Sequence, residues 1–216
     1  MDTAHHERHY ENGRFIYHMT ALRNLPSIFR YGLRSRQSLD RFRAQDTAFV
    51  DIANPEIIAY RTSYHITSYI PFHFYLRTPC EYNMIHAHPD VPVAYIAIER
   101  SYAEASGFKI IPTHPMSGTM KYQPEVFDYN EGFQRIDWPA MNRRNYSAPV
   151  EKNACMAECV TDQPVDVLSL ARKNLAIFYS CNEAQKRFIK EAACQACQHC
   201  NRANGCFKII VNPKFF

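Results

Sequence analysis

Residues 15–36, FIYHMTALRNLPSIFRYGLRSR, pass within one short stretch from a strand pattern to a helical pattern. Phe15, Ile16 and Tyr17 are aromatic or β-branched, which favours a β-strand. Apolar side chains then recur at helical spacing, at Leu22, Leu25, Ile28 and Phe29. A strand that runs into a helix presents side chains and free N–H groups at one corner. Such a corner suits an anionic or polar ligand.

Local signals define the ends of the predicted helix. Thr20 can cap it, Pro26 is tolerated only near its first turn, and Gly32 is placed to end it. His18 and Thr20 then lie where the strand ends. The residues alone leave a plainer alternative open, in which His18 is satisfied by backbone groups and Asn24 belongs to an ordinary turn.

Three segments of this stretch resemble the opening of the DarT family: Tyr17-His18-x-Thr20, Asn24-Leu25-Pro26-Ser27-Ile28, and Gly32-Leu33. Members of that family are toxins that transfer ADP-ribose from NAD to bases in single-stranded DNA. In that family the opening histidine and threonine, and the asparagine that follows, hold the NAD. The resemblance therefore implies that His18, Thr20 and Asn24 bind NAD here.

The composition fits one globular domain. The chain has 216 residues, of which 46% are hydrophobic and 21% are charged. We expect a flexible tail over residues 1–14 and a single domain over residues 15–216. No run is long or apolar enough to span a bilayer, and the polar N-terminus has no apolar signal region. We therefore expect a cytoplasmic protein that makes no contact with a membrane.

One glutamate is the predicted catalytic residue. Ala157, Glu158, Val160 and Pro164 match the family's Gln-Ala-Glu-Phe-Leu-Val segment and the proline that follows it, whereas Cys159 replaces the usual aromatic residue. The resemblance implies that Glu158 stabilises the cation formed when the nicotinamide–ribose bond breaks and removes a proton from the attacking base. From the residues alone, the alternative is a glutamate at the edge of the core that pairs with an arginine.

The family also has an arginine that contacts NAD close to this glutamate. We assign that role to Arg61, which ends the short apolar run Ile57-Ile58-Ala59-Tyr60. Arg43 is the competing assignment, and a surface ion pair is the alternative without a ligand. An arginine beside a pyrophosphate acts as a fixed charge and a bidentate donor.

A second segment points to DNA. Residues 69–75 read as a strand with Pro71 at an edge or at a strand start. They resemble the family's Tyr-Val-Pro-Phe-Tyr-Phe run, which is followed by an arginine that faces DNA. The matching residue is Arg77, and we predict a DNA contact for it.

Three further residues are predicted to face the acceptor. His114 belongs to a partial match to the family's Thr-Asp-Gly-His-Ala-Ala segment. Arg143 and Arg144 lie in residues 122–146, a loop-rich, aromatic region that suits unpaired bases. The alternatives are a loop histidine without a role, a lid packed by its own aromatic side chains, and solvated charges, because the net charge is only +4.

Four cysteines near the C-terminus follow the spacing C-x2-C-x2-C-x5-C: Cys194, Cys197, Cys200 and Cys206. The spacing is compatible with zinc or an iron–sulfur cluster. We favour thiols packed at the end of a helix that Asn182 caps and that runs from residue 183 to about residue 200. Residues 207–216 then read as a closing strand.

These patterns together predict an α+β ADP-ribosyltransferase fold with two small sheets that meet at an NAD cleft. The predicted function is a toxin that transfers ADP-ribose from NAD to single-stranded DNA, with thymine favoured, and that is paired with a DarG-like macrodomain antitoxin. Transfer to guanine or to RNA is one alternative. A catalytically inactive nucleic-acid-binding module and a structural metal-binding domain are the others.

Overall fold

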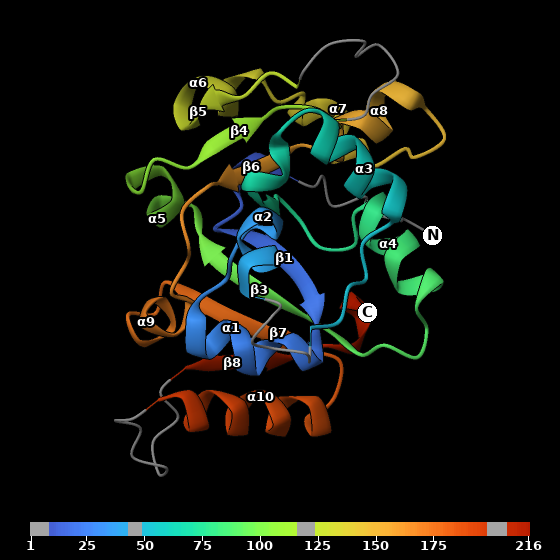
Figure 1. Ribbon diagram of the computed structural model, residues 1–216. Helices are drawn as coiled ribbons and strands as arrows, with labels where there is room; N and C mark the ends of the chain where they lie inside the picture. The colour runs from blue at the N-terminus through green and yellow to red at the C-terminus, as the bar shows by residue number, and fades with distance from the viewer. Residues whose placement is uncertain (1–8, 43–48, 116–123, 198–206) are drawn as a thin grey trace.

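Eight strands form one mixed sheet in the order β5-β4-β6-β2-β1-β3-β7-β8, with helices on both faces (Figure 1). The computed structural model describes residues 9–42, 49–115, 124–197 and 207–216. All neighbouring strands are antiparallel except β7 and β8, which are parallel. The α+β class agrees with the prediction, but the prediction of two small sheets is wrong.

The strands are β1 (Phe15–Ala21), β2 (Ile70–His73), β3 (Val93–Glu99), β4 (Lys109–Ile111), β5 (Phe127–Asp128), β6 (Glu158–Thr161), β7 (Ala176–Ser180) and β8 (Lys208–Val211). The α-helices are α1 (Leu25–Tyr31), α2 (Arg36–Phe42), α3 (Pro55–Ser63), α4 (Pro79–Ala87), α5 (Arg100–Ala105), α6 (Tyr129–Arg135), α7 (Trp138–Arg143), α8 (Pro149–Ala154), α9 (Val167–Arg172) and α10 (Glu183–Ala196). Short 3-10 helices are η1 (Tyr10–Asn12), η2 (Leu22–Asn24), η3 (Ile66–Ser68) and η4 (Pro213–Phe215).

The sheet has two halves that meet at a narrow junction. β1 pairs with β2 at one position only, Tyr17 with His73, whereas its pairing with β3 continues from Phe15 to Ala21. The single sheet is therefore almost divided between β1 and β2. The sequence predicts two small sheets, whereas the single pair between β1 and β2 joins them into one sheet. We call this narrow junction the seam.

Pro71 is the second residue of β2 and lies at this junction, in a central strand. Its carbonyl oxygen accepts a hydrogen bond from Nδ1 of His18 at 2.8 Å. The N–H and C=O of one residue in an antiparallel strand face the same neighbour. The missing N–H of Pro71 therefore faces β1, where the backbone ladder has already stopped, and the proline is tolerated.

β3 anchors the core on both faces of the sheet. Its residues from Val93 to Ile98 are all buried. Ala94, Ile96 and Ile98 pack with side chains of α1, α9 and α10, whereas Tyr95 and Ala97 pack on the opposite face with β7 and the C-terminal residues. The period of two along this strand explains why one short segment serves both cores.

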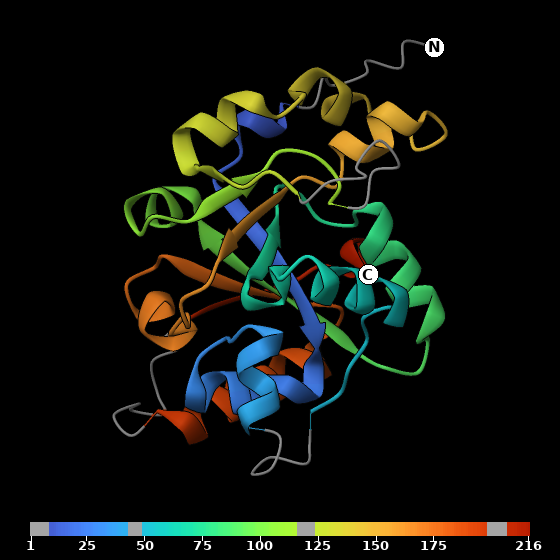
Figure 2. The same cartoon turned by 45° about the horizontal axis from the view of Figure 1, so that its top comes forward.

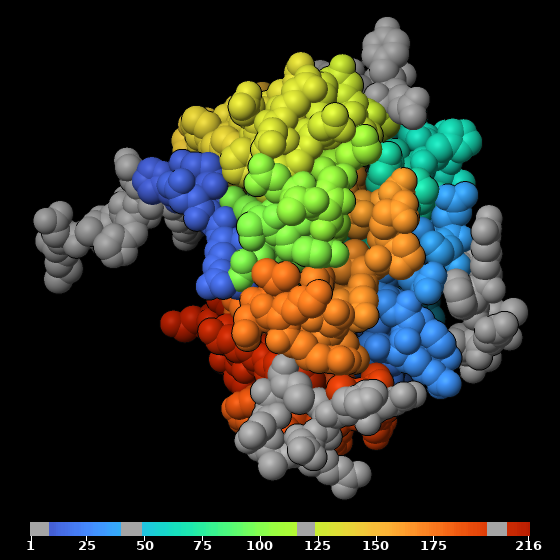
Figure 3. Space-filling model, turned by 90° about the vertical axis from the view of Figure 1, so that its left-hand side faces the viewer, coloured from blue at the N-terminus to red at the C-terminus, as the bar shows by residue number. Residues whose placement is uncertain are grey.

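The helices form groups around the sheet. α1, α9 and α10 lie around β7 and β8, α6 to α8 lie beyond β4 and β6, and α3 and α4 lie on the right in Figures 1 and 2. In the space-filling view, the segment around α5 and β4 lies between α6 and α9 (Figure 3). Among the helices of the described residues, none has the length and apolar character needed to cross a bilayer.

Residues 15–36 form the predicted strand and helix, but the predicted cap at Thr20 is wrong. β1 continues through Thr20 to Ala21, so Thr20 is a strand residue and not a helix cap. Gly32 ends α1 with φ of 80° and ψ of 160°. Its neighbour Leu33 then pairs with Val165.

Several other segments differ from the sequence reading. Residues 122–146 contain β5, α6 and α7 where described, because Asp137 caps α7 and apolar side chains such as Met141 are buried. Residues 9–14 are not a loose tail, since Tyr10 stacks on Tyr75 with ring centroids 4.7 Å apart.

The backbone at Gly32 gives a test of the fold. In Gly32→Ala, the new Cβ would lie 3.1 Å from the Val165 carbonyl oxygen, in a conformation that only glycine adopts readily. We expect the free energy of unfolding to fall by about 1–3 kcal/mol in urea denaturation. Gly107→Ala is the matched control, because φ is 69° there but no atom lies within 4 Å of the new Cβ. An equal loss for both variants would contradict the proposed contact with Val165.

Candidate active site

A cavity of about 240 Å³, here called the inner pocket, opens at the junction between β1 and β2. It brings together all five side chains that the sequence assigns to NAD binding or catalysis: His18, Thr20, Asn24, Arg61 and Glu158. These residues come from distant parts of the chain. The near-division of the sheet therefore creates the one place where they meet.

Glu158 and Arg61 form an ion pair in this pocket. Glu158 is the first residue of β6, and Arg61 lies in the last turn of α3. Nη1 of Arg61 donates to both carboxylate oxygens at 2.9 Å. The Arg61 side chain is 13% exposed and that of Glu158 is 8% exposed. Removing either side chain would leave the charge of the other one buried without a counter-charge, which is unfavourable. The two hydrogen bonds also fix the position of the carboxylate relative to the guanidinium group. The competing Arg43 lies outside the described residues.

His18 is neutral in this environment. Its Nδ1 donates to Pro71, so Nε2 keeps a lone pair. Burial lowers the pKa of the His18 imidazole to about 4, against a smaller opposing effect of the Pro71 carbonyl. At neutral pH the ring can therefore accept a hydrogen bond from a hydroxyl group but carries no charge.

His73 is a pocket residue that the sequence analysis did not single out. It is 8% exposed, lines the inner pocket and lies opposite Glu158 in the β2–β6 ladder. Its Nδ1 is 3.3 Å from the carbonyl oxygen of Ala157. Its position could be inferred from the sequence, because His73 lies two residues after Pro71 in the same strand and therefore on the same face of the sheet.

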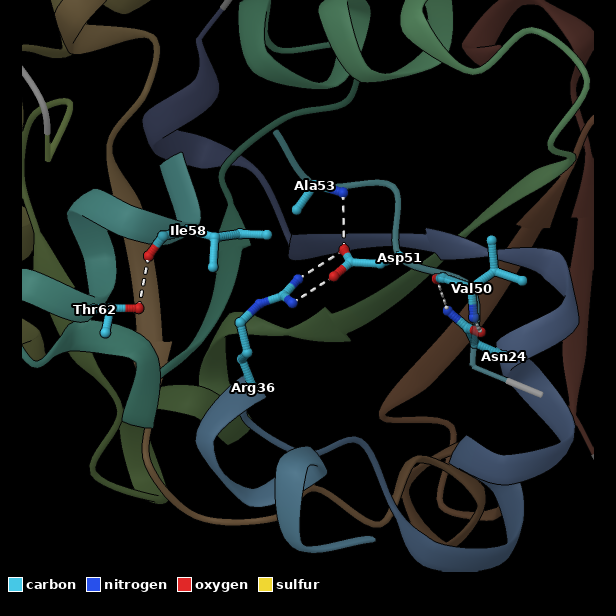
Figure 4. A network of polar contacts seen from close by, with 7 residues as sticks. All are labelled: Asn24, Arg36, Val50, Asp51, Ala53, Ile58 and Thr62. Atoms are coloured by element: carbon cyan, nitrogen blue, oxygen red, sulfur yellow. Dashed lines mark hydrogen bonds and ion pairs between the residues drawn. The ribbon is translucent and has the colours of Figure 1, made fainter. Parts of the chain in front are cut away.

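The Asn24 side chain holds the segment at residues 49–53, which lines the inner pocket (Figure 4). Its Oδ1 accepts from the backbone N–H of Val50 at 2.8 Å. Its Nδ2 donates to the Val50 carbonyl at 2.9 Å and to Oγ1 of Thr20 at 3.2 Å. Both amide hydrogens are thus used within the protein. In this structure Asn24 and Thr20 shape the pocket by holding the segment at residues 49–53.

A second clamp holds the same segment and was missed by the sequence analysis. The Arg36 guanidinium makes two hydrogen bonds to the Asp51 carboxylate, one of them 2.8 Å long (Figure 4). Asp51 also accepts from the backbone N–H of Ala53. The two-pronged geometry fixes direction as well as distance. No local pattern in the sequence marks this pair.

A larger cavity of about 1030 Å³, here called the outer groove, adjoins the inner pocket. Five residues line both: Ile52, Asn54, Ile57, Cys80 and Met84. Burial, with a smaller contribution from the nearby Glu158 charge, raises the pKa of the Cys80 thiol to about 12. The Cys80 side chain, which lines both cavities and forms a shared wall between them, is therefore uncharged. His114, predicted to face the acceptor, lines the outer groove.

The remaining predicted DNA contacts divide between two places. Arg77 and Arg144 line a third cavity of about 790 Å³, and Nη2 of Arg144 donates to the Arg77 carbonyl at 3.1 Å. Arg143 lines none of these three cavities and pairs with Glu151 at 2.6 Å. The structure thus brings Arg77 and Arg144 together but not Arg143.

The cysteine segment is only partly described. Cys194 lies in α10 and Cys197 follows it, whereas Cys200 and Cys206 lie outside the described residues. Within residues 9–42, 49–115, 124–197 and 207–216, no group of three or more His, Cys, Asp or Glu side chains could hold a metal ion. Asn182 caps α10 as predicted, by accepting from the backbone N–H of Gln185.

The buried His18 gives a prediction about pH. As the pH falls from 6.5 to about 4, the unfolded chain binds a proton that the folded ring does not, so the free energy of unfolding should fall. The full effect is roughly 3 kcal/mol. His18→Gln removes this group, so the stability difference between wild type and variant should change within this window and stay constant above pH 7. Parallel curves from pH 7 to 4 would contradict a neutral His18.

Comparisons with known proteins identify the family and the fold. The family model DarT, described as ssDNA thymidine ADP-ribosyltransferase, matches residues 17–199. No curated protein matches the chain. Thermus sp. 2.9 DarT in complex with ADP-ribosylated ssDNA is similar in structure, with a TM-score of 0.72 and 17% identity over 97% of this chain and 99% of that chain.

Two further structures are similar. Thermus sp. 2.9 DarT in complex with NAD+ has a TM-score of 0.66 and 15% identity over 95% of this chain and 98% of that chain. Thermosipho africanus DarTG in complex with ADP-ribose has a TM-score of 0.69 and 18% identity over 94% of this chain, which spans only 51% of that longer chain. The fold is thus that of DarT ADP-ribosyltransferases, as predicted. Since the family model matches most of its length, the chain belongs to the DarT family of ssDNA thymidine ADP-ribosyltransferases.

Proposed function

We propose that this protein transfers ADP-ribose from NAD to a thymine base of single-stranded DNA and releases nicotinamide, with residues 15–216 as the catalytic domain. The observation that carries the proposal is the buried Arg61–Glu158 pair, close to the Cys80 wall that the inner pocket shares with the outer groove. A donor in one cavity and an acceptor in the other would meet at this carboxylate. Membership of the family supports the same reaction.

We assign the inner pocket to NAD. The neutral His18 would accept a hydrogen bond from a ribose hydroxyl through Nε2. Thr20 and Asn24 would support the NAD through the wall that they hold. Arg61 would supply a fixed positive charge for the pyrophosphate while it keeps Glu158 in place. Thermus DarT, which is similar in fold, is known in complex with NAD+.

The chemistry places two demands on Glu158. Breaking the bond between the nicotinamide nitrogen and the ribose gives a cation with oxocarbenium character, which a nearby carboxylate stabilises. Thymine N3 must lose its proton as it forms the new bond to the ribose carbon, and Glu158 would accept that proton. The products are nicotinamide, the ADP-ribosylated base and one proton, which leaves with solvent.

We assign the outer groove to the acceptor base. His114 would contact the DNA there, and Arg77 and Arg144 would contact the strand farther from the reacting base. Arg143 would contribute only at the rim, since Glu151 shares its charge. Arginines beside aromatic side chains suit unpaired bases and their phosphates.

We further propose that the protein is a toxin of the cytoplasm, controlled by a DarG-like macrodomain antitoxin. The likeness to Thermosipho DarTG, in which the matching part is about half of a longer chain, supports such a partner. Transfer to guanine or RNA is disfavoured by the family description, which specifies thymidine in ssDNA. An inactive binding module is disfavoured because it would have no need of a buried Arg61–Glu158 pair in a cavity.

The role of Glu158 is tested by Glu158→Gln, which keeps the shape of the side chain and one acceptor oxygen for Arg61 but removes the proton acceptor and its negative charge. At saturating NAD, we expect the rate of transfer from labelled NAD to a thymine oligonucleotide to fall by about 10²–10⁴-fold. Glu131→Gln, at an exposed carboxylate of α6, is the control and should keep full activity. Wild-type rates in Glu158→Gln would remove Glu158 from the mechanism.

The acceptor atom is tested with modified oligonucleotides. A single strand with one thymine should be labelled, whereas the same strand in a perfect duplex should not, because N3 is then used in base pairing. A strand with N3-methylthymine should also remain unlabelled. Strands with guanine as the only other candidate base, and the RNA counterpart, serve as comparisons. Equal labelling of the methylated and normal strands would rule out N3 as the acceptor.

A further inference from the structure

The inner pocket contains a second pair of opposite charges, which the proposed reaction at Glu158 does not use. Among the described residues that line this pocket, only Asp51 and Glu158 carry a carboxylate. Each is paired with an arginine, Asp51 with Arg36 and Glu158 with Arg61. The Arg36–Asp51 pair holds residues 49–53, but uncharged side chains could also do this. The presence of two charges beside a ligand pocket therefore points to a further role.

The Arg36–Asp51 pair is more accessible than the Arg61–Glu158 pair. The Asp51 side chain is 32% exposed and that of Arg36 is 24% exposed, whereas that of Glu158 is 8% exposed. Oδ1 of Asp51 accepts from Nη2 of Arg36 at 2.8 Å and from the backbone N–H of Ala53 at 3.1 Å. A ligand in the inner pocket can touch this carboxylate, because Asp51 lines the pocket and is only partly covered by protein.

Apolar side chains of the pocket flank both members of the pair. Leu39 lies three residues after Arg36 on α2 and therefore on the same side of that helix. Phe49 lies two residues before Asp51 in the segment that the pair holds. Leu39, Phe49 and the buried Leu33 all line the inner pocket. Apolar and aromatic surface of this kind suits a flat purine ring.

The proposed reaction determines which half of NAD lies beside this pair. The bond that breaks joins nicotinamide to its ribose, so that half belongs at Glu158. The adenosine half then takes the rest of the pocket, where Leu39 and Phe49 offer apolar surface to the adenine ring. In Figure 4, Arg36 reaches from α2 to Asp51 on the facing segment. This arrangement brings the adenosine ribose beside the Arg36–Asp51 pair.

We propose that the Arg36–Asp51 pair makes the protein select NAD over NADP. The two dinucleotides differ only at the adenosine ribose, where NADP has a phosphate in place of the 2′-hydroxyl group. The hydroxyl group of NAD donates to Asp51, as it does to an acidic residue in unrelated dinucleotide-binding folds. The phosphate has no such donor, and Asp51 repels its charge of about −2. The inference rests on the proposed function, because it takes the inner pocket as the donor site.

Arg36 does not reverse this preference while Asp51 is present. Both terminal nitrogen atoms of its guanidinium group donate to the Asp51 carboxylate, which also balances its charge. Without that carboxylate, the same planar group has the geometry to bind a phosphate. A second arginine of the pocket, Arg34, donates through Nε to the Tyr31 carbonyl at 2.9 Å. The two members of the Arg36–Asp51 pair therefore have opposite effects on the choice of donor.

The test uses two variants that break the same clamp but change the charge of the pocket in opposite directions. Asp51→Asn removes a negative charge and leaves Arg36 to the 2′-phosphate, so the ratio of NADP affinity to NAD affinity should rise by about 10- to 100-fold. Arg36→Ala leaves Asp51 negative, so this ratio should stay at the wild-type value or fall. Isothermal titration calorimetry of the full chain with NAD and with NADP gives both affinities without DNA.

A matched control separates this effect from the general loss of an ion pair. Asp128→Asn removes a carboxylate from the exposed Lys109–Asp128 pair, which lies outside the three cavities. It should leave both affinities unchanged. Initial rates of transfer at limiting donor should show the same change in the ratio of kcat/KM for the two donors in Asp51→Asn.

Each outcome decides between donor selection and a clamp without such a role. Equal weakening of NAD and NADP by Asp51→Asn would overturn the inference, and so would a rise of the affinity ratio in Arg36→Ala. A wild type that binds NADP as tightly as NAD would also overturn it. If the affinities change as expected but no strand receives ADP-ribose, the inference on donor choice is supported and the proposed reaction fails.

Discussion

The narrow pairing between β1 and β2 is the constraint on which the site depends. Only Tyr17 and His73 connect the two strands in the backbone ladder, and the side chain of His18 continues the connection by donating to Pro71. A full ladder here would close the space that the inner pocket occupies. A complete separation would leave β6, and with it Glu158, without a fixed position relative to β1. The seam therefore holds the two halves of the sheet on either side of the inner pocket.

Few side chains at the seam carry a charge. Burial keeps His18 neutral, and the Cys80 thiol stays protonated, so the Arg61–Glu158 pair supplies the fixed charges beside the shared wall. A carboxylate in such surroundings interacts strongly with a cation that develops nearby. The Arg36–Asp51 pair lies at the wall formed by residues 49–53 and serves a different purpose, because it holds that segment in place.

Much of the site could be predicted from the sequence, since its motifs are local. Glu158 and Arg61 were assigned from short matches, and the fold brings them into contact at 2.9 Å. The clamps on residues 49–53 could not be predicted, because their partners are set by how distant segments pack and not by spacing. Thr20 was misread as a cap because a threonine before a helical pattern is the usual capping signal, whereas β1 continues through it. The single sheet was missed because one residue pair at the seam leaves almost no trace in the sequence.

In the proposed reaction, donor and acceptor approach Glu158 from different cavities. The most direct measurement is a crystal structure with carba-NAD+ and a thymine oligonucleotide bound together. We expect the nicotinamide ribose in the inner pocket beside Glu158 and His18. We also expect the thymine ring to enter across Cys80 from the outer groove, with N3 facing the ribose. A thymine ring in the inner pocket, or a nicotinamide ribose far from Glu158, would rule out this arrangement of donor and acceptor.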